Sequence, residues 1–517
     1  MTESTAGATT DPLAPATLGP VTLRNRVIKA ATFEGASPGA LVSDRLIDYH
    51  LAVAEGGVGM TTVAYLAVAP EGRTHADCIF WRPEALAGLR RLTDEIHKTG
   101  AKVSAQIGHA GPVANAKSNG APSLAPARSF NALGMAFNRA ATAEDLARVV
   151  EQHADAARMA VETGFDAIEV HLGHNYLPSS FLSPRLNPRT DEFGGSLVNR
   201  ASFPRRILAA VREAVAEVGG GRVAVLAKMN MRDGYRGGFD LPESVELARL
   251  LESDGHLDAL ELTGGSSFMN PMYLFRGEAP YREMAANMPL HPVIRMGMRM
   301  VGKGFFKEYP YKPLYFLDSA REFRRALTMP LVLLGGVTDL SGMRTAMDEG
   351  FDYVAMARAL LREPDLVNRL RADPATVSGC THCNLCMSTI YPGTHCHLDT
   401  GSAAGRGQDR VERRCEVGRT RPAADPAGRR LGAGAVRRGR GDLHPAAVGT
   451  RGDGCRGPGP RRRRLIGSSD PGLLTSRTRS SFAVRCRHGY QPHRSPQRSS
   501  DGLGAGAPQE PSDHSSR

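Results

Sequence analysis

Two histidines and a tyrosine stand at the end of the apolar run FDAIEVH: His171 is its last residue, and His174 and Tyr176 follow directly. Imidazoles can donate hydrogen bonds to an oxygen that gains negative charge during a reaction, and a phenol can supply a proton. Two other interpretations stay open. The histidines could bind zinc, although no nearby carboxylate or thiolate completes such a site, or all three could be satisfied polar residues of a loop. The pattern favours an oxyanion site with a proton donor beside it.

A second group of residues has the chemistry to hold a phosphate. Gly335 and Gly336 end one apolar run, and Ala357 and Arg358 end the next. Glycine lets the backbone approach a ligand closely, and the planar guanidinium of arginine matches phosphate oxygens. Together these four residues indicate a phosphorylated cofactor or substrate.

The elements that must position these residues alternate along the chain. Short, continuously apolar runs are typical of strands covered on both faces, and they lie at residues 27–33, 59–68, 102–107, 165–171, 223–230, 257–263, 331–336 and 353–357. Helical patterns lie at residues 44–55, 84–99, 142–163, 197–217, 241–253, 318–328, 339–349 and 359–372. The alternation predicts an α/β fold, a (β/α)8 TIM barrel, whose active residues follow the strands. A doubly wound open sheet competes, but AATFEGAS is not its glycine-rich first turn.

Longer segments extend this pattern into a family resemblance. The chain reads HLGHNYL, SSFLSP, NPRTDEFGGS and then Asn199-Arg200. In this order the segments resemble the Old Yellow Enzyme family of FMN-dependent ene-reductases and the related NADH:flavin oxidoreductases. The resemblance covers about residues 12–396. Within the family, the chain resembles a single-barrel relative of 2,4-dienoyl-CoA reductase.

The resemblance implies FMN as cofactor, NADH or NADPH as reductant and an activated alkene as substrate. His171 and His174 would hold the carbonyl or nitro oxygen of the alkene, and Tyr176 would protonate its α-carbon. Four further residues match positions at the flavin. These are Thr32 at the C4 carbonyl, Ala64 where a small residue lets the ring pass, Gln106 at the pyrimidine, and Lys228 near N1 and O2. A cation there stabilises the negative charge of the reduced flavin.

Three departures from the family pattern stand out. The first strand reads KAAT where much of the family reads APMT, and Ala357 replaces a common glycine of the phosphate loop. The long segment 264–316 is rich in Met, Pro and Tyr. It is either a lid over the substrate or a packed surface insertion.

Four cysteines, Cys380, Cys383, Cys386 and Cys396, form the pattern C-x2-C-x2-C-x9-C. Thiolates at such spacing can hold a [4Fe–4S] cluster or a zinc ion, and a set of bare thiols is the third interpretation. Relatives of the dienoyl-CoA reductase type place three residues before the third cysteine. They also carry a further flavin and NADPH domain, whose glycine-rich fingerprint is missing from residues 397–517.

The chain divides by composition into residues 1–379 for the FMN-binding barrel, 380–398 for the cysteine segment and 399–517 for a low-complexity tail. From residue 401 the tail holds 24 Arg, no Lys and 10 acidic residues, whereas residues 1–400 hold 41 basic and 43 acidic residues. Such a tail cannot bury a core, so we expect disorder. Translation in a shifted frame explains the missing lysine, and the alternative function is a nucleic-acid-binding arm on an inactive barrel.

The remaining composition is that of an ordinary globular protein. No apolar run is long enough to span a membrane, and the N-terminus has no secretory signal, so we expect a cytoplasmic protein. The expected partners are the alkene and NAD(P)H, with no membrane. Nucleic acid is disfavoured as a partner, and formation of a homo-oligomer stays open.

Overall fold

The computed structural model describes residues 10–131, 134–219, 221–288, 290–391 and 393–398. The low-complexity tail, with its predicted disorder, its frame-shift interpretation and its nucleic-acid alternative, lies outside these residues. The barrel and almost all of the cysteine segment lie within them.

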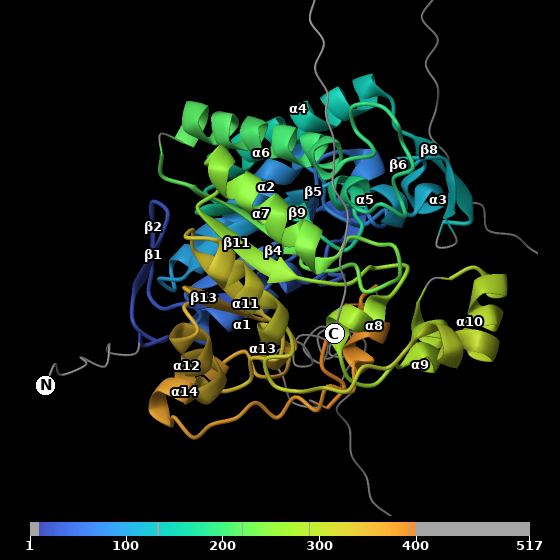
Figure 1. Cartoon of the computed structure of the whole chain (residues 1–517). Coiled ribbons are helices and arrows are strands. Elements are labelled where there is room, and N and C mark those ends of the chain that lie inside the picture. The colour runs from blue at the N-terminus through green and yellow to red at the C-terminus, as the bar shows by residue number, and fades with distance from the viewer. Residues whose placement is uncertain (1–9, 132–133, 220, 289, 392, 399–517) are drawn as a thin grey trace, which may run out of the picture. The chain divides into compact units, whose positions relative to one another are not determined.

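Parallel strands form a closed barrel in which each strand pairs with the next along the chain and the last pairs with the first (Figure 1). The wall consists of β3 (Val27–Lys29), β4 (Met60–Ala67), β5 (Lys102–Gly108), β9 (Ala167–Leu172), β10 (Ala224–Asn230), β11 (Ala259–Thr263), β12 (Leu331–Leu334) and β13 (Tyr353–Met356). All eight predicted runs contribute a wall strand, so the (β/α)8 prediction is confirmed. The first run is shorter than expected, because its strand ends at Lys29.

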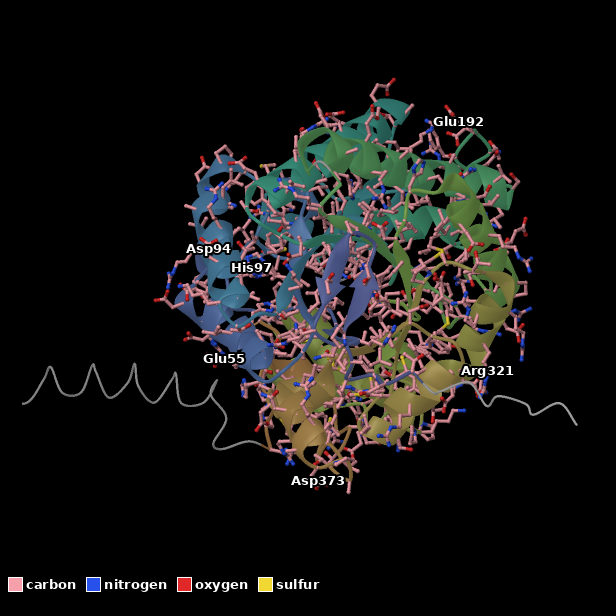
Figure 2. The ribbon with its side chains drawn as sticks, turned by 90° about the vertical axis from the view of Figure 1, so that its left-hand side faces the viewer. Glu55, Asp94, His97, Glu192, Arg321 and Asp373 are labelled. Carbon is pink, nitrogen blue, oxygen red and sulfur yellow. The ribbon has the colours of Figure 1, made fainter. Side chains whose placement is uncertain are left out.

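Helices cover the outside of the wall (Figure 1). They are α1 (Asp44–Glu55), α2 (Pro83–His97), α4 (Ala143–Glu162), α6 (Leu197–Gly219), α7 (Leu241–Asp254), α11 (Leu317–Ala326), α12 (Leu340–Asp348), α13 (Arg358–Arg362) and α14 (Leu366–Ala372). Asp94, Arg321 and Asp373 lie at the periphery of this layer in Figure 2. The helix expected at 359–372 is two helices, because Pro364 lies between them and proline cannot continue a helix.

Local sequence explains where these helices begin. In α4, Thr142 and Asp145 cap each other reciprocally, and each side chain accepts from the backbone N–H of the other residue. Single side-chain caps start α1 at Ser43, α7 at Asp240 and α12 at Asp339. These caps fix the loops that enter the helices and therefore the loops that leave the strands.

Successive residues of each wall strand face opposite sides of the wall. On β9, Ile168, Val170 and Leu172 pack into the apolar core on the helix side. Ala167 belongs to the separate core inside the barrel, and Glu169 and His171 share its face of the strand. The inner face is thus apolar at the start of the strand and polar at its end.

A hairpin of β1 (Ala16–Leu18) and β2 (Val21–Leu23) closes the end of the barrel where the strands begin. Leu18, Val21 and Leu23 are buried against the inner residues of the wall, and the Tyr353 hydroxyl donates to the Thr17 carbonyl at 2.6 Å. This end is therefore filled with apolar side chains.

The remaining elements lie in the loops. They are η1 (Pro38–Ala40), η2 (Pro70–Gly72), η3 (Gly111–Val113), α3 (Ala116–Asn119), a small sheet of β6 (Leu124–Ala125), β7 (Ser129–Asn131) and β8 (Ala136–Ala140), α5 (Leu177–Leu182), α8 (Pro271–Phe275), α9 (Tyr281–Asn287), α10 (Pro292–Phe305) and η4 (Leu385–Thr389). None of the helices in the described part of the chain is long and apolar enough to cross a membrane.

Candidate active site

A cavity of about 1200 Å³ opens where the wall strands end. Known ligand pockets usually measure about 300–1000 Å³, so this one has room for a cofactor together with a substrate. The sequence-predicted residues that line it are Thr32, Ala64, Gln106, His171, His174, Tyr176, Lys228, Ala357, Arg358 and Cys386. Residues from distant parts of the sequence thus meet at the end of the barrel that carries active sites in this fold.

The two predicted histidines converge on one point of the cavity. His171 Nε2 and His174 Nδ1 lie 3.2 Å apart. His171 belongs to β9, whereas His174 lies in the following loop with φ of 59°. The loop is held by Asn230 of β10, whose Oδ1 accepts from the His174 backbone N–H at 3.1 Å. An oxygen atom placed at this point can be reached by both rings.

Burial keeps both imidazoles neutral. It lowers the pKa of His171 far below its usual value, and the charges of His174 and Lys228 lower it further. Burial and Lys228 lower the pKa of His174 to about 3. The Thr263 hydroxyl lies 3.0 Å from His174 Nε2, and when it donates to that nitrogen the proton of His174 is on Nδ1. The pair therefore suits hydrogen-bond donation to an oxyanion and is unsuited to acting as a charged acid.

Tyr176 stands beside the histidine pair. Its ring centroid lies 4.5 Å from that of His171 and 5.2 Å from that of Tyr65, with the rings nearly perpendicular in both cases. Tyr176 immediately precedes α5, and its backbone N–H donates to the Gly173 carbonyl at 3.1 Å. Burial raises the pKa of Tyr176, with Cys78 and Tyr391 adding to the effect. The phenol therefore keeps its proton at neutral pH and can donate it.

Lys228 lies on the inner face of β10 and is almost fully buried. Its Nζ is 3.1 Å from Glu169 Oε2 and 3.0 Å from Glu261 Oε1. Burial lowers the pKa of Lys228, but the two carboxylates more than reverse this effect, so the ammonium stays charged. Gln106 Nε2 donates to the same oxygen of Glu169. Lys228 and Gln106 thus lie at the cavity as one hydrogen-bonded polar group.

Thr32 and Ala64 also line the cavity, from the loop after β3 and from β4. The Thr32 hydroxyl accepts from Lys29 Nζ and donates to Glu34 Oε1, both at 2.8 Å. This hydroxyl is therefore engaged with a buried ion pair. The role of Thr32 at the flavin C4 carbonyl stays a prediction.

The predicted phosphate residues divide into two pairs. Ala357 and Arg358 line the cavity. Gly335 and Gly336 do not line it, but they directly follow the lining residue Leu334 in the sequence. Both glycines have positive φ, and a Cβ on Gly335 would come within 2.7 Å of the Phe316 ring. The glycines thus let the chain before α11 pack closely against β12, and their contact with a phosphate stays a prediction.

Arg358 holds its charge among neutral partners. Its Nη1 donates to the Arg276 carbonyl at 3.0 Å and to the Asn384 side-chain oxygen. No carboxylate among the described residues pairs with it. A guanidinium held in this way is available to an anionic ligand.

The long segment 264–316 forms the roof of the cavity. Its helices α8, α9 and α10 and the residues that flank them supply apolar lining residues, namely Met269, Met284, Met288, Met298, Phe305 and Phe306. Met284, Met288 and Phe306 also pack with Met387 of the cysteine segment in one apolar cluster. The segment therefore covers the cavity, and its role as a lid over a substrate stays a prediction.

The four predicted cysteine ligands are all free and partly buried. In the described residues, no group of three or more His, Cys, Asp or Glu side chains is arranged to hold a metal ion. Neither the four cysteines nor His171 and His174 form such a group among these residues. The segment itself packs on the barrel, since the Thr394 N–H donates to the Glu34 carbonyl at 2.8 Å.

Several residues of the site were missed by sequence reasoning. Glu169, Glu261, Asn230 and Thr263 are buried on wall strands and either line the cavity or contact residues that do. The alternation of the strands is the signal that could have found them. Glu169 lies two residues before His171, and parallel pairing places Glu261 opposite Lys228.

The fold and the site define a class, a (β/α)8 barrel whose cavity brings together two imidazoles, a phenol and two buried or half-buried cations. Residues 13–257 match the model of the NADH:flavin oxidoreductase / NADH oxidase family. The chain is 53% identical over 382 residues to a 4,4'-dithiodibutanoate disulfide reductase from Rhodococcus erythropolis, covering 74% of this chain and 93% of the relative. It therefore belongs to this family and is an NAD(P)H:flavin oxidoreductase.

Two further likenesses agree with this assignment. An NADPH dehydrogenase from Bacillus subtilis is 31% identical over 362 residues, covering 68% of this chain and 91% of the relative. The solved structure of an Old Yellow Enzyme homologue from Zymomonas mobilis superposes with a TM-score of 0.57 at 20% identity, covering 75% of this chain and 98% of that one. The chain spans about half the length of several other curated relatives.

The cavity fits the FMN of this family. A cation with neutral partners, Arg358, suits the phosphate, and Lys228 with Gln106 suits the polar edge of the ring. Small side chains at Ala30, Ala31 and Ala64 leave space on the floor. The buried His171 Nδ1 has no protein partner, which is compatible with a proton on Nε2, the nitrogen that faces the cavity.

Proposed function

We propose that this enzyme passes hydride from NAD(P)H, by way of FMN, to an activated alkene such as an α,β-unsaturated carbonyl compound. The observation that carries the proposal is the convergence of His171 Nε2 and His174 Nδ1, 3.2 Å apart, beside the Tyr176 ring. Two neutral donors and a protonated phenol are the groups that such an alkene requires.

FMN, when bound, supplies the relay of hydride between NAD(P)H and the acceptor. Arg358, and with it Gly335 and Gly336, would hold the phosphate. Lys228, Gln106 and Thr32 would contact the ring, and Ala64 would leave room for it. NAD(P)H and the alkene would use the same space in turn, since the cavity is continuous.

The residues of the chain then divide the reduction between them. His171 and His174 donate to the carbonyl oxygen and stabilise the negative charge that grows on it when hydride reaches the β-carbon. Tyr176 gives its proton to the α-carbon and recovers one from solvent. The alkene gains one hydride and one proton, and NAD(P)H becomes NAD(P)+.

A disulfide is the second candidate acceptor, because the relative at 53% identity is named as a disulfide reductase. In that reaction, one hydride and one proton convert a disulfide into two thiols. Tyr176 would protonate the departing thiolate. The two candidates need the same cofactor and the same acid, and they differ in the group that the histidines hold.

Three further expectations stay separate predictions. They are a [4Fe–4S] cluster on Cys380, Cys383, Cys386 and Cys396, a cytoplasmic location, and a homo-oligomer. The cluster would leave a broad brown absorbance after the flavin is reduced.

The test is an absorbance spectrum of the purified protein, recorded before and after anaerobic addition of NADPH or NADH. We expect a yellow flavin spectrum that bleaches, and that recovers when 2-cyclohexenone or 4,4'-dithiodibutanoate is added. A colourless protein that takes up no FMN would overturn the proposal. Recovery with the disulfide alone would replace the alkene by the second candidate.

Tyr176→Phe separates the two halves of the reaction. Bleaching by NADPH should be unchanged, because no proton is needed from the phenol in that step. Reoxidation by the alkene should slow roughly 10²–10⁴-fold, the usual contribution of a positioned acid. Equal loss in both halves would mean that Tyr176 acts on the cavity as a whole.

A further inference from the structure

We infer that Arg128 and Arg185 form a recognition site for an anionic group on the acceptor, a carboxylate above all, at the rim of the cavity. The inference rests on the proposed function and specifies its substrate class as an elongated, largely apolar acceptor with a carboxylate at one end.

The charged side chains that line the cavity are all basic. Its lining includes the basic residues Arg128, Arg185, Lys228 and Arg358, and among the described residues it includes no Asp or Glu. A cavity walled by one sign of charge attracts ligands of the opposite sign. FMN and NAD(P)H carry phosphates, so each cation must be assigned to a ligand in turn.

Two of the four cations already have defined surroundings. Lys228 is paired with Glu169 and Glu261 in the barrel interior. Arg358 is tied to the Arg276 carbonyl and to Asn384, at the side of the cavity where β13 ends. These two serve the FMN site proposed above.

Arg128 and Arg185 are exposed, and neither is paired with a carboxylate in the described part of the chain. The Arg128 guanidinium lies 4.2 Å from the centre of the Phe137 ring, which holds the side chain but leaves its N–H groups unused. Arg185 lies in the loop that follows α5, nine residues after Tyr176. Both arginines thus offer free planar forks, the geometry that carboxylates prefer.

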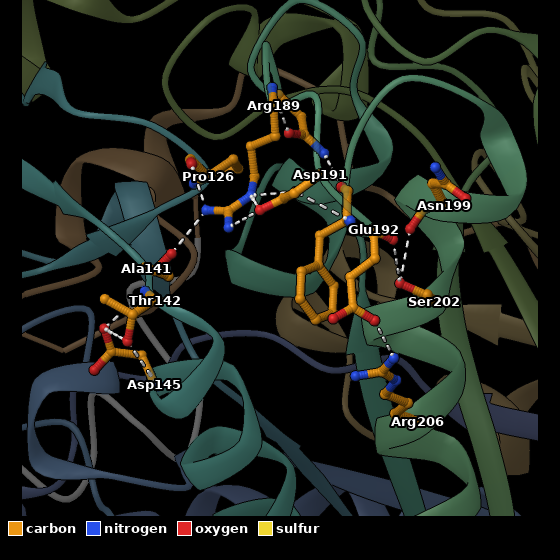
Figure 3. Close-up of polar contacts among 12 residues, drawn as sticks. Pro126, Ala141, Thr142, Asp145, Arg189, Asp191, Glu192, Asn199, Ser202 and Arg206 are labelled. Atoms are coloured by element: carbon orange, nitrogen blue, oxygen red, sulfur yellow. Dashed lines mark hydrogen bonds and ion pairs between the residues drawn. The ribbon is translucent and has the colours of Figure 1, made fainter.

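Arg189 of the same loop shows what a structural arginine looks like here (Figure 3). Its guanidinium pairs with Asp191 and donates to the Pro126 carbonyl at 3.2 Å and to the Ala141 carbonyl at 2.7 Å. Arg128 lies two residues beyond Pro126. Arg189 therefore fastens the loop that carries Arg185 to the segment that carries Arg128, and both free arginines sit on one rim.

The apolar roof supplies the rest of the recognition. Met284, Met288, Met298 and Phe306 line the same cavity as the two arginines and the histidines. Methionine side chains adapt to the shape of an apolar ligand. An acceptor that reaches from the rim to His171 and His174 thus presents an apolar body to the roof and an anion to the arginines.

The test uses two acceptors that differ at one remote position, 4-carboxy-β-nitrostyrene and its methyl ester. The holoenzyme should have a kcat/KM for the carboxylate at least tenfold above that for the ester. Arg185→Ala and Arg128→Ala should each lower kcat/KM for the carboxylate roughly tenfold, as for loss of one charged hydrogen bond, and leave the ester unchanged. Arg185→Lys should recover part of the loss, since the charge remains without the fork.

Arg91→Ala is the matched control, because Arg91 is an exposed arginine paired with Asp44 on the helix layer. Equal use of acid and ester by wild type and variants would overturn the inference, while reduction of both would leave the proposed function standing. Slower anaerobic bleaching by NADPH in Arg185→Ala, with no acid-to-ester difference, would assign the arginines to the phosphates of the reductant. Failure of wild type to reduce either acceptor would instead count against the proposed alkene chemistry.

Discussion

Two buried lysines, Lys29 and Lys228, lie on wall strands of the same barrel but belong to different regions. Lys29 of β3 pairs with Glu34, 2.8 Å from its Nζ, and lies 4.9 Å from the Tyr49 ring of α1. It is enclosed between the wall and the helix layer. Lys228 of β10 lies inside the barrel at the cavity, between Glu169 and Glu261.

The difference between the two lysines follows from the face of the strand on which each lies. Residues on the outward face of a strand contact the helix layer, and there the charge of the Lys29 ammonium is cancelled by the single Glu34 carboxylate. Inward residues near the strand ends meet the cavity, and there two carboxylates share one ammonium. The Lys29–Glu34 pair has no net charge and supports the fold. The group of Lys228, Glu169 and Glu261 carries an excess negative charge, which a bound ligand or a proton on one carboxylate can compensate. Similar residues thus acquire a structural or a functional role by position alone.

The largest expected effect comes from breaking the enclosed pair. Lys29→Met leaves the Glu34 carboxylate buried without its partner, and removal of one member of a buried pair usually costs about 3–5 kcal/mol. Burial already raises the pKa of Glu34, and Lys29 offsets part of that rise. Urea unfolding measures the loss of unfolding free energy.

Lys98→Met is the control for that measurement, because Lys98 forms an exposed pair with Glu95 and exposed pairs contribute about 0–1 kcal/mol. If both variants lost the same small amount, the enclosed pair would not have the structural role assigned to it.

The second effect falls on the inward face. His174→Ala removes one of two oxyanion donors, which typically lowers kcat about 10²–10³-fold. Stability should change little, because the His174 ring is only half-buried. Steady-state rates with 2-cyclohexenone and a thermal melt measure the two quantities on one preparation.

His174→Asn sharpens the result, since an amide N–H can replace the imidazole donor and should restore part of kcat. If a His174 variant lost stability and kept its kcat, His174 would have a structural role, and the assignment of function to the inward face of the strands would be wrong. His97→Ala, on the helix layer, serves as the matched histidine control.

The barrel could be predicted from the sequence because its signals repeat. Each wall strand is an apolar run, and each helix has an amphipathic pattern, often with a capping residue such as Thr142 or Asp240. His171, His174 and Tyr176 could be found because their chemistry is concentrated in six residues at the end of a strand and in the loop after it. Local signals of this kind need no tertiary information.

The parts that escaped prediction depend on tertiary contacts. β1 and β2 have three residues each, too few to show a period. The roof helices find their core with Met387 of the cysteine segment, which lies 103 residues after Met284 and 81 residues after Phe306. The rim pairing of Arg128 and Arg185 depends on Arg189, whose partners lie 48 and 63 residues earlier in the chain.

The smallest expected effect concerns the excess carboxylate inside the barrel. Burial and the neighbouring Glu169 raise the pKa of Glu261 from 4.5 to about 8, against the opposing charge of Lys228. A carboxyl group with a raised folded-state pKa stabilises the fold while it is protonated. That contribution is complete below the unfolded pKa of 4.5 and is lost as the pH rises through 8.

Glu261→Gln tests this inward charge, because glutamine keeps the shape of the side chain and cannot ionise. The Tm of the wild type should fall between pH 6 and pH 9 more steeply than that of the variant. Because neighbouring groups share the proton, we expect a difference of about 1 kcal/mol, or roughly 2 °C. Glu246→Gln, an exposed residue of α7, should follow the wild type. Parallel curves of Tm against pH for wild type and Glu261→Gln would mean that Lys228 holds both carboxylates ionised. The protonation state of the group around Lys228 would then be as constant across this pH range as that of the Lys29–Glu34 pair.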